Sequence, residues 1–116
     1  MTASQTETIH RKVQVLPEAL TSHLDGIRAL CVQYGIRALF VFGSAVQGTF
    51  DPETSDLDFV VDAGEYGPDI VSRLGGFSYA LERLLGRDID LITVRSTGDP
   101  RFLAEVDATR VEIYAA

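Results

Sequence analysis

The chain has 116 residues, with 17 acidic and 10 basic side chains, a formal net charge of −7 and 46% hydrophobic residues. This composition is typical of one folded domain and excludes a largely disordered chain. The negative charge opposes binding to a nucleic acid backbone, so we expect no direct nucleic acid partner.

The longest stretch without a charged residue runs from Ala38 to Phe50. It is too short and too rich in polar residues and glycine to cross a bilayer, so we predict no membrane segment. The first twelve residues lack the apolar run of a secretory signal, and the lone Cys31 allows no internal disulfide. We therefore expect a cytoplasmic protein.

The first predicted elements are a helix and a strand. Residues 1–15 are polar and aperiodic, and we interpret them as a mobile tail before a single domain over residues 16–116. From Pro17, apolar residues recur every three or four positions until Gly35, which predicts an amphipathic helix. The entirely apolar run Ala38–Phe42, stopped by a glycine, predicts a central strand that is buried on both faces.

A loop and a second strand are predicted next. Residues 48–55 are dense in turn-forming residues, which indicates a loop. In the strand predicted over residues 56–61, a period of two places Leu57, Phe59 and Val61 on one face. The two aspartates of this segment lie on the other face, so one side of the strand packs and the other carries charge.

The rest of the chain continues this alternation. Apolar spacing over residues 70–84 predicts a second helix, which the Gly75 and Gly76 pair weakens and Gly86 ends. The remaining predictions are a strand over 88–94, a turn over 97–100, a short helix over 102–106 and a last strand over 111–114. The sequence therefore indicates the α/β (α+β) class, with a small mixed β-sheet and helices packed on it.

Gly43 and Ser44 follow the first predicted strand and could hold a phosphate. Glycine lets the backbone approach a ligand closely, and serine at a helix start offers a hydroxyl beside free N–H groups. The alternative is structural, because a glycine and a serine after a strand can form a simple turn and N-cap.

Asp56 and Asp58 are the second candidate pair. Residues at i and i+2 on one strand face have Cα atoms about 7 Å apart, so both carboxylates can share divalent ions. No Lys or Arg occurs between residues 38 and 72, so a bound cation is the natural counter-charge. The alternative is an edge strand with a solvated polar face.

Asp88 and Asp90 repeat the pattern on a later strand. We expect Asp88 to be solvated at the start of the strand and Asp90 to lie deeper. If this strand lies beside the strand of Asp56 and Asp58, a third carboxylate joins the cluster and a two-metal site for phosphoryl-type transfer becomes possible.

Together these residues resemble a known family. Gly43-Ser44, a spacer, Asp56-Leu57-Asp58 and the later Asp90 are similar to the motifs of the DNA polymerase β-type nucleotidyltransferases. Within them, the chain length and the ending Arg110-Val111-Glu112-Ile113-Tyr114 resemble the minimal nucleotidyltransferases (MNT), the antitoxins of HEPN/MNT toxin–antitoxin pairs. The resemblance covers residues 37–116 and implies the polymerase β-type nucleotidyltransferase fold.

The resemblance also implies roles. Asp56, Asp58 and Asp90 would be the catalytic, metal-binding residues for Mg²⁺, with Mn²⁺ as a substitute, and Gly43 and Ser44 would bind the phosphates of ATP. Asp90 would accept the proton of an attacking hydroxyl. AMP would then move from ATP to a tyrosine hydroxyl of a HEPN ribonuclease toxin, a partner held in a hetero-oligomer, and silence it.

Two alternative functions remain open from the sequence. Related proteins commonly carry a basic residue where this chain has Gln47, so a second hypothesis is a catalytically weak or inactive antitoxin of the same fold that only binds its partner. A phospho-acceptor signalling domain is disfavoured, because such domains need a lysine late in the chain and the only lysine here is Lys12.

Overall fold

The computed structural model describes residues 16–94 and 100–116. The predicted tail, residues 1–15, and residues 97–99 of the predicted turn lie outside these ranges. The elements in chain order are α2 (Glu18–Thr21), α3 (Leu24–Gln33), β1 (Ala38–Phe42), α4 (Ser44–Gln47), β2 (Leu57–Asp62), α5 (Ile70–Leu85), β3 (Ile89–Thr93), α6 (Pro100–Thr109) and β4 (Val111–Ala115).

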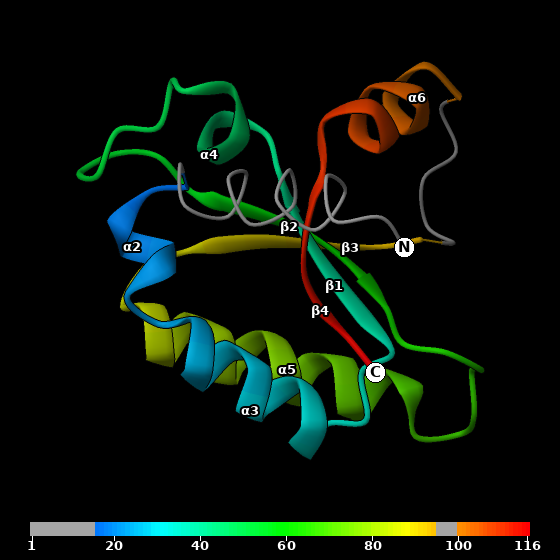
Figure 1. Cartoon of the computed structure of the whole chain (residues 1–116). Coiled ribbons are helices and arrows are strands. Elements are labelled where there is room, and N and C mark those ends of the chain that lie inside the picture. The colour runs from blue at the N-terminus through cyan, green and yellow to red at the C-terminus, as the bar shows by residue number, and fades with distance from the viewer. Residues whose placement is uncertain (1–15, 95–99) are drawn as a thin grey trace, which may run out of the picture.

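The strands form one mixed sheet in the order β3-β2-β1-β4, which Figure 1 shows in the middle of the molecule. Strand β1 is antiparallel to both β2 and β4, whereas β2 and β3 are parallel. Parallel neighbours need a crossover, and α5 supplies it. The predicted fold class and the interior position of β1 are both confirmed.

Helices α3 and α5 lie side by side against one face of the sheet (Figure 1). The alternation of residues in β1 and β2 turns one set of apolar side chains toward these helices. Cys31 is fully buried among them, as predicted, and burial raises the pKa of its thiol to about 12. The largest fully buried side chains are Phe59, Phe77, Leu20, Ile27, Leu39, Leu57, Leu81, Val41 and Val61.

The opposite face of the sheet has a much smaller apolar cluster. Phe42, Val60 and Val106 are buried there, with Phe40 and Ile92 partly buried against them. Of these, Val106 comes from α6, which lies on the side of the sheet opposite α3 and α5 (Figure 1). The side chains of Asp58 and Asp90 therefore project from the face with the thinner cover.

The first predicted helix needed a correction, and the second is confirmed. The helix predicted from Pro17 to Gly35 is two helices, because the chain turns at Ser22, whose hydroxyl donates to the Glu18 carbonyl over 2.6 Å, before α3 begins. Helix α5 runs through the glycine pair. Gly76 faces Tyr34, and a Cβ on Gly76 would lie 2.9 Å from Cε1 of that tyrosine. The glycine permits close packing of the two helices.

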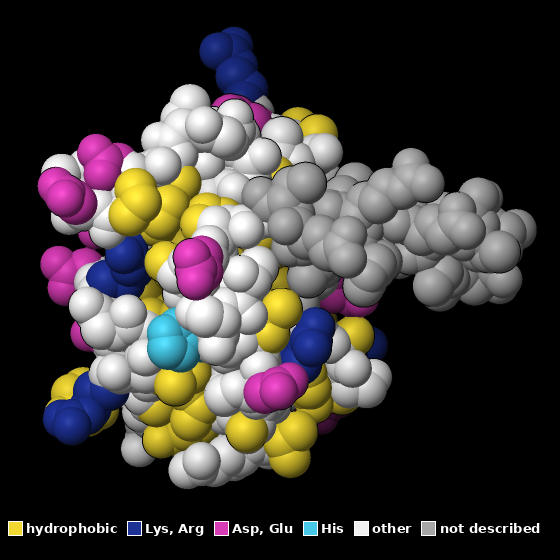
Figure 2. Space-filling view, turned by 60° about the vertical axis from the view of Figure 1, so that its left-hand side comes forward, with side chains coloured by type: hydrophobic (Ala, Val, Ile, Leu, Met, Phe, Trp, Pro, Cys, Tyr) yellow, Lys and Arg dark blue, Asp and Glu magenta, His cyan; other side chains and the backbone are white. Residues whose placement is uncertain are grey.

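Helix α6 is longer than the helix predicted there. Within the described ranges, no helix combines the length and apolarity needed to cross a membrane. Acidic side chains gather along the left-hand edge of the face shown in Figure 2, while the Lys and Arg side chains in that view are dispersed. The negative charge of the chain is thus unevenly distributed on this face.

Candidate active site

The candidate site begins where β1 ends. Gly43 has φ 73° and ψ −146°, and Ser44 is the first residue of the four-residue helix α4. The N-cap position of this helix belongs to Gly43, and no side-chain hydrogen bond caps the helix, so Ser44 is not its capping residue. The backbone turns sharply here, in a region of φ and ψ that only glycine adopts readily.

Asp58 lies directly against this turn. Its register partner on β1 is Phe42, the residue before Gly43. A Cβ placed on Gly43 would collide with Oδ2 of Asp58. The absence of a side chain at Gly43 is therefore what allows the Asp58 carboxylate to approach the end of β1.

Asp58 and Asp90 form a carboxylate pair. They are register partners on the parallel strands β2 and β3, and their carboxyl groups lie within hydrogen-bonding reach. Burial, then the hydrogen bond and the charge of Asp90, raise the pKa of Asp58 to about 6. We predicted that Asp90 lies deep, but it is exposed and Asp58 is the partly buried member, because β3 is an edge strand.

Asp56 lies just before β2 and is exposed. Its negative charge contributes to the raised pKa of Asp58, although less than Asp90 does. In the described ranges no three His, Cys, Asp or Glu side chains converge as a metal-binding group. The structure thus brings two of the three predicted carboxylates into contact and leaves Asp56 beside them. Asp88 is exposed, as predicted.

Replacing Asp58 with asparagine should stabilise the protein in the absence of divalent cations. The folded pKa, about 6, exceeds the ordinary value of 3.8, so the folded state binds more protons than the unfolded state between these values. Stability therefore falls as pH rises through that window, and the asparagine variant avoids this loss. Because water screens a partly buried group, we expect a gain of about 1 kcal/mol, or about 5 °C in Tm, above pH 7.

The measurement is thermal unfolding from pH 4 to pH 8 in a chelating buffer. The gain should vanish below pH 4, where both states carry the protonated carboxyl. Asp88→Asn removes the same charge from an exposed position and should leave Tm nearly unchanged. An Asp58→Asn variant that is less stable than wild type at pH 8 would contradict the assignment of a strained carboxylate pair.

Arg87 is a residue that the sequence analysis missed. Its guanidinium donates to the carbonyls of Ser55 and Pro52 over 3.0 and 2.7 Å and lies 5.0 Å from the ring centroid of Phe50. Its Nε is buried and, among the described residues, has no hydrogen-bond partner. Arg87 therefore holds the loop that precedes Asp56 against the residues just before β3. No pattern in the sequence predicted this role.

Arg87→Met should lower the free energy of unfolding by about 2 kcal/mol, since hydrogen bonds from a charged donor to two carbonyls are lost. The matched control is Arg83→Met, because Arg83 is exposed and its guanidinium contacts the exposed Tyr79 side chain. The control should change stability by less than about 0.5 kcal/mol. Urea denaturation measures the free energy of unfolding of both variants. Equal losses of stability would show that Arg87 does not hold the loop.

Comparison with known proteins identifies the class. Residues 25–112 match the family of nucleotidyltransferase domains, and the chain belongs to that family. A relative from Methanocaldococcus jannaschii, provisionally named a protein adenylyltransferase, is 33% identical over 67 residues, which cover 58% of this chain and 69% of the relative. The enzyme class expected from the sequence, nucleotidyltransferase, is confirmed.

Solved structures that are similar to this chain include minimal nucleotidyltransferases. A structure provisionally described as a minimal nucleotidyltransferase is 30% identical with a TM-score of 0.68, over 81% of this chain and 92% of that chain. The complex of a tri-AMPylated HEPN toxin from Shewanella oneidensis with its MNT antitoxin matches at 18% identity and a TM-score of 0.58, over 82% of this chain and 71% of that chain. The second match shows a shared fold, and the predicted resemblance to minimal nucleotidyltransferases is confirmed.

Proposed function

We propose that this domain transfers AMP from ATP to a hydroxyl group of a partner protein, with Mg²⁺ as the cofactor. The observation that carries the proposal is the Asp58 and Asp90 carboxylate pair beside the Gly43 turn. Such a pair is electrostatically unfavourable alone and becomes favourable when a divalent cation and a nucleotide phosphate occupy the site.

The donor chemistry fits Mg²⁺. Carboxylate oxygens are the ligands that this hard cation prefers, and Mg²⁺ in nucleotide sites uses few protein carboxylates because phosphates and water complete its shell. Asp58 and Asp90 would hold the cation, with Asp56 as a further ligand. A bound divalent cation supplies neutralisation of charge on the attacking and leaving oxygens.

Different residues of the chain perform different parts of the reaction. The Gly43 backbone and the Ser44 hydroxyl bind and orient the phosphates of ATP. Asp90, the exposed carboxylate of the pair, accepts the proton from the acceptor hydroxyl. The hydroxyl oxygen then bonds to the α-phosphorus, the bond from that phosphorus to the β-phosphate oxygen breaks, and pyrophosphate leaves.

The acceptor that we propose is a tyrosine of a HEPN-type toxin. Two likenesses support it: the name of the Methanocaldococcus relative denotes transfer of AMP to protein, and the toxin in the Shewanella complex is AMPylated. The net charge of −7 would also speed the encounter with a basic partner. The domain would act as an antitoxin by modifying and holding its partner.

The proposal is tested by label transfer from ATP that is labelled on the α-phosphate, with Mg²⁺, in a lysate that contains the native partner. A labelled protein band whose mass increases by AMP is expected, and the band should be absent with the Asp56→Asn/Asp58→Asn variant. ATP labelled on the γ-phosphate is the matched control, because its label leaves with pyrophosphate. Absence of a band with folded wild type that captures its partner would overturn the transferase proposal.

That last outcome would support the second candidate, an antitoxin that only binds. The observation that favours it is Gln47, which ends α4, is exposed and brings no positive charge to the phosphates. In that case, neutralisation of the toxin should survive the double Asp variant. Loss of neutralisation in the folded double variant would exclude the binding-only function.

A further inference from the structure

All four tyrosines of the chain lie within the described ranges, and they differ in exposure. Tyr34 and Tyr114 are partly buried and pack against the core. Tyr66 is 42% exposed, and Tyr79 on α5 is 60% exposed. Phe77, two positions before Tyr79, is fully buried. Because consecutive helical residues are rotated by about 100°, Tyr79 projects from the side of α5 that lies away from the sheet.

The two exposed tyrosines differ in the charge beside them. Nη1 of Arg83, one turn after Tyr79, donates a hydrogen bond to the Tyr79 hydroxyl oxygen over 3.2 Å, and the guanidinium carbon lies 5.8 Å from the ring centroid. One turn before Tyr79, a Cβ on Gly75 would meet no atom of the described residues within 4 Å. Tyr66, in contrast, directly follows Glu65. Tyr79 therefore combines a cation at its hydroxyl with open space beside its ring.

The candidate active site has the opposite charge. Asp56 and Asp90 are exposed and both act electrostatically on Asp58. No Lys or Arg occurs between residues 38 and 72 to neutralise them. An acceptor hydroxyl that brings a cation with it is attracted to such a site, whereas one next to a carboxylate is repelled. On this criterion, Tyr79 beside Arg83 is the acceptor on this chain that fits the site best.

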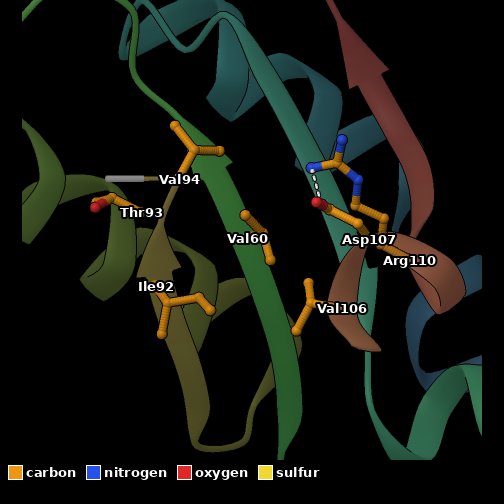
Figure 3. Close-up of a pocket in the computed structure, with 7 residues that line it drawn as sticks. All are labelled: Val60, Ile92, Thr93, Val94, Val106, Asp107 and Arg110. Atoms are coloured by element: carbon orange, nitrogen blue, oxygen red, sulfur yellow. Dashed lines mark ion pairs between the residues drawn. The ribbon is translucent and has the colours of Figure 1, made fainter. Parts of the chain in front are cut away.

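The site is also accessible to a hydroxyl on a rigid surface. Asp90 is exposed on the edge strand β3, so the convex face of a helix can approach it. Val60 and Ile92 follow Asp58 and Asp90 by two positions and share their strand faces. There a trough of about 330 Å³ continues from the carboxylate pair, between β3 and α6 (Figure 3). This face of the sheet is therefore open beside the carboxylates.

We propose that Tyr79 is a self-modification site, at which one copy of the chain receives AMP from the active site of a second copy. This inference rests on the proposed function. Helices α3 and α5 cover the face of the sheet opposite the carboxylate pair (Figure 1), so the hydroxyl of Tyr79 reaches a site on another copy and not its own. The proposal therefore names an acceptor in addition to the toxin.

The step follows the chemistry of the proposed function. The Tyr79 hydroxyl gives its proton to Asp90 of the donor copy. The phenol oxygen bonds to the α-phosphorus of ATP, the bond from that phosphorus to the β-phosphate oxygen breaks, and pyrophosphate leaves. The product is a phosphodiester with one negative charge, and Arg83 beside Tyr79 pairs with that charge.

The experiment incubates the purified chain, without a partner protein, with Mg²⁺ and ATP that is labelled on the α-phosphate. Tandem mass spectrometry then locates the AMP, and we expect it on Tyr79. Tyr79→Phe and Arg83→Met should each lower self-labelling at least about tenfold, through loss of the nucleophile and of the charged hydrogen-bond donor. The matched control Tyr66→Phe should leave it within about twofold, as for a surface substitution outside the site.

A mixture of two variants assigns the two roles to separate copies. An Asp58→Asn chain should receive label on Tyr79 from a Tyr79→Phe chain, although neither variant labels itself. A second measurement needs no reaction and uses α,β-methylene-ATP, whose α-phosphorus cannot release pyrophosphate. When the Tyr79→Phe chain with this analogue and Mg²⁺ is added to isotope-labelled Asp58→Asn chain, the ring resonances of Tyr79 should shift and those of Tyr114 should not.

The outcomes separate this inference from the proposed function. Label on the native partner but none on Tyr79 would overturn the inference and leave the proposed function intact. Label on a different residue of the chain, or an Asp58→Asn chain that stays unlabelled in the mixture, would also overturn it. Failure of transfer both to the partner and to Tyr79 would overturn the proposed function and the inference together. Thermal unfolding verifies that each variant is folded.

Discussion

Asp58→Asn should reduce AMP transfer by at least about 10³-fold, which corresponds to about 4 kcal/mol of lost transition-state stabilisation. Asp58 is the carboxylate that touches both the Gly43 turn and Asp90, so its loss removes a cation ligand and the charge that complements the nucleotide site. The same variant should be more stable in the absence of cations. Activity and stability therefore change in opposite directions, as expected where a fold maintains an unfavourable charge for function.

The matched control is Asp62→Asn. Asp62 lies on the same strand and the same face as Asp58, but it pairs with Arg37 over 3.9 Å and accepts a hydrogen bond from the Gly64 amide. Its replacement should leave transfer within about threefold of wild type. Label transfer at saturating ATP measures both variants, and equal losses would show that the general negative charge of β2, rather than the Asp58 site, supports the reaction.

Gly43→Ala should have the second largest effect, with transfer reduced at least about 10²-fold and stability reduced by about 1–3 kcal/mol. The new Cβ would meet Oδ2 of Asp58, and the φ of 73° is strained for alanine. The carboxylate must move, and a displacement of even about 1 Å lowers rates strongly where positioning supplies the catalysis.

The Gly48→Ala variant distinguishes the effect of backbone strain from that of a steric clash with Asp58. Gly48 also has a positive φ, 80°, but a Cβ there would meet no atom within 4 Å. This control should lose about 1–2 kcal/mol of stability and little activity. A double-mutant cycle adds a second check, because Gly43→Ala should cost less stability when Asp58→Ala has already removed the colliding oxygen. Additive costs would argue against the collision.

Much of the sheet and the residue types of the site follow from local pattern. The apolar run Ala38–Phe42 predicted β1, and the alternation after Asp56 predicted β2. A strand buried on both faces is apolar throughout, whereas a strand buried on one face alternates apolar and polar residues. Gly43, Ser44, Asp58 and Asp90 were predicted as site residues because phosphate and cation chemistry restricts which side chains can serve.

The helix ends were less predictable. Local spacing did not reveal the break at Ser22 between α2 and α3, whereas it did predict that α5 runs through its glycine pair and ends at Gly86. Tertiary packing explains the glycine at position 76 of α5, because a side chain there would collide with Tyr34 at the end of α3. A glycine's intrinsic helix penalty is outweighed when a close helix contact depends on it.

By itself, the sequence determined the fold class and the family resemblance and supplied the candidate carboxylates, because these depend on residue type and on spacing along the chain. Tertiary structure alone decided that Asp58 rather than Asp90 is partly buried, that Arg87 fastens the loop before Asp56, and that a trough continues from the carboxylate pair. These features arise from contacts between strands and loops distant in sequence, and such contacts leave no periodic signal in the chain.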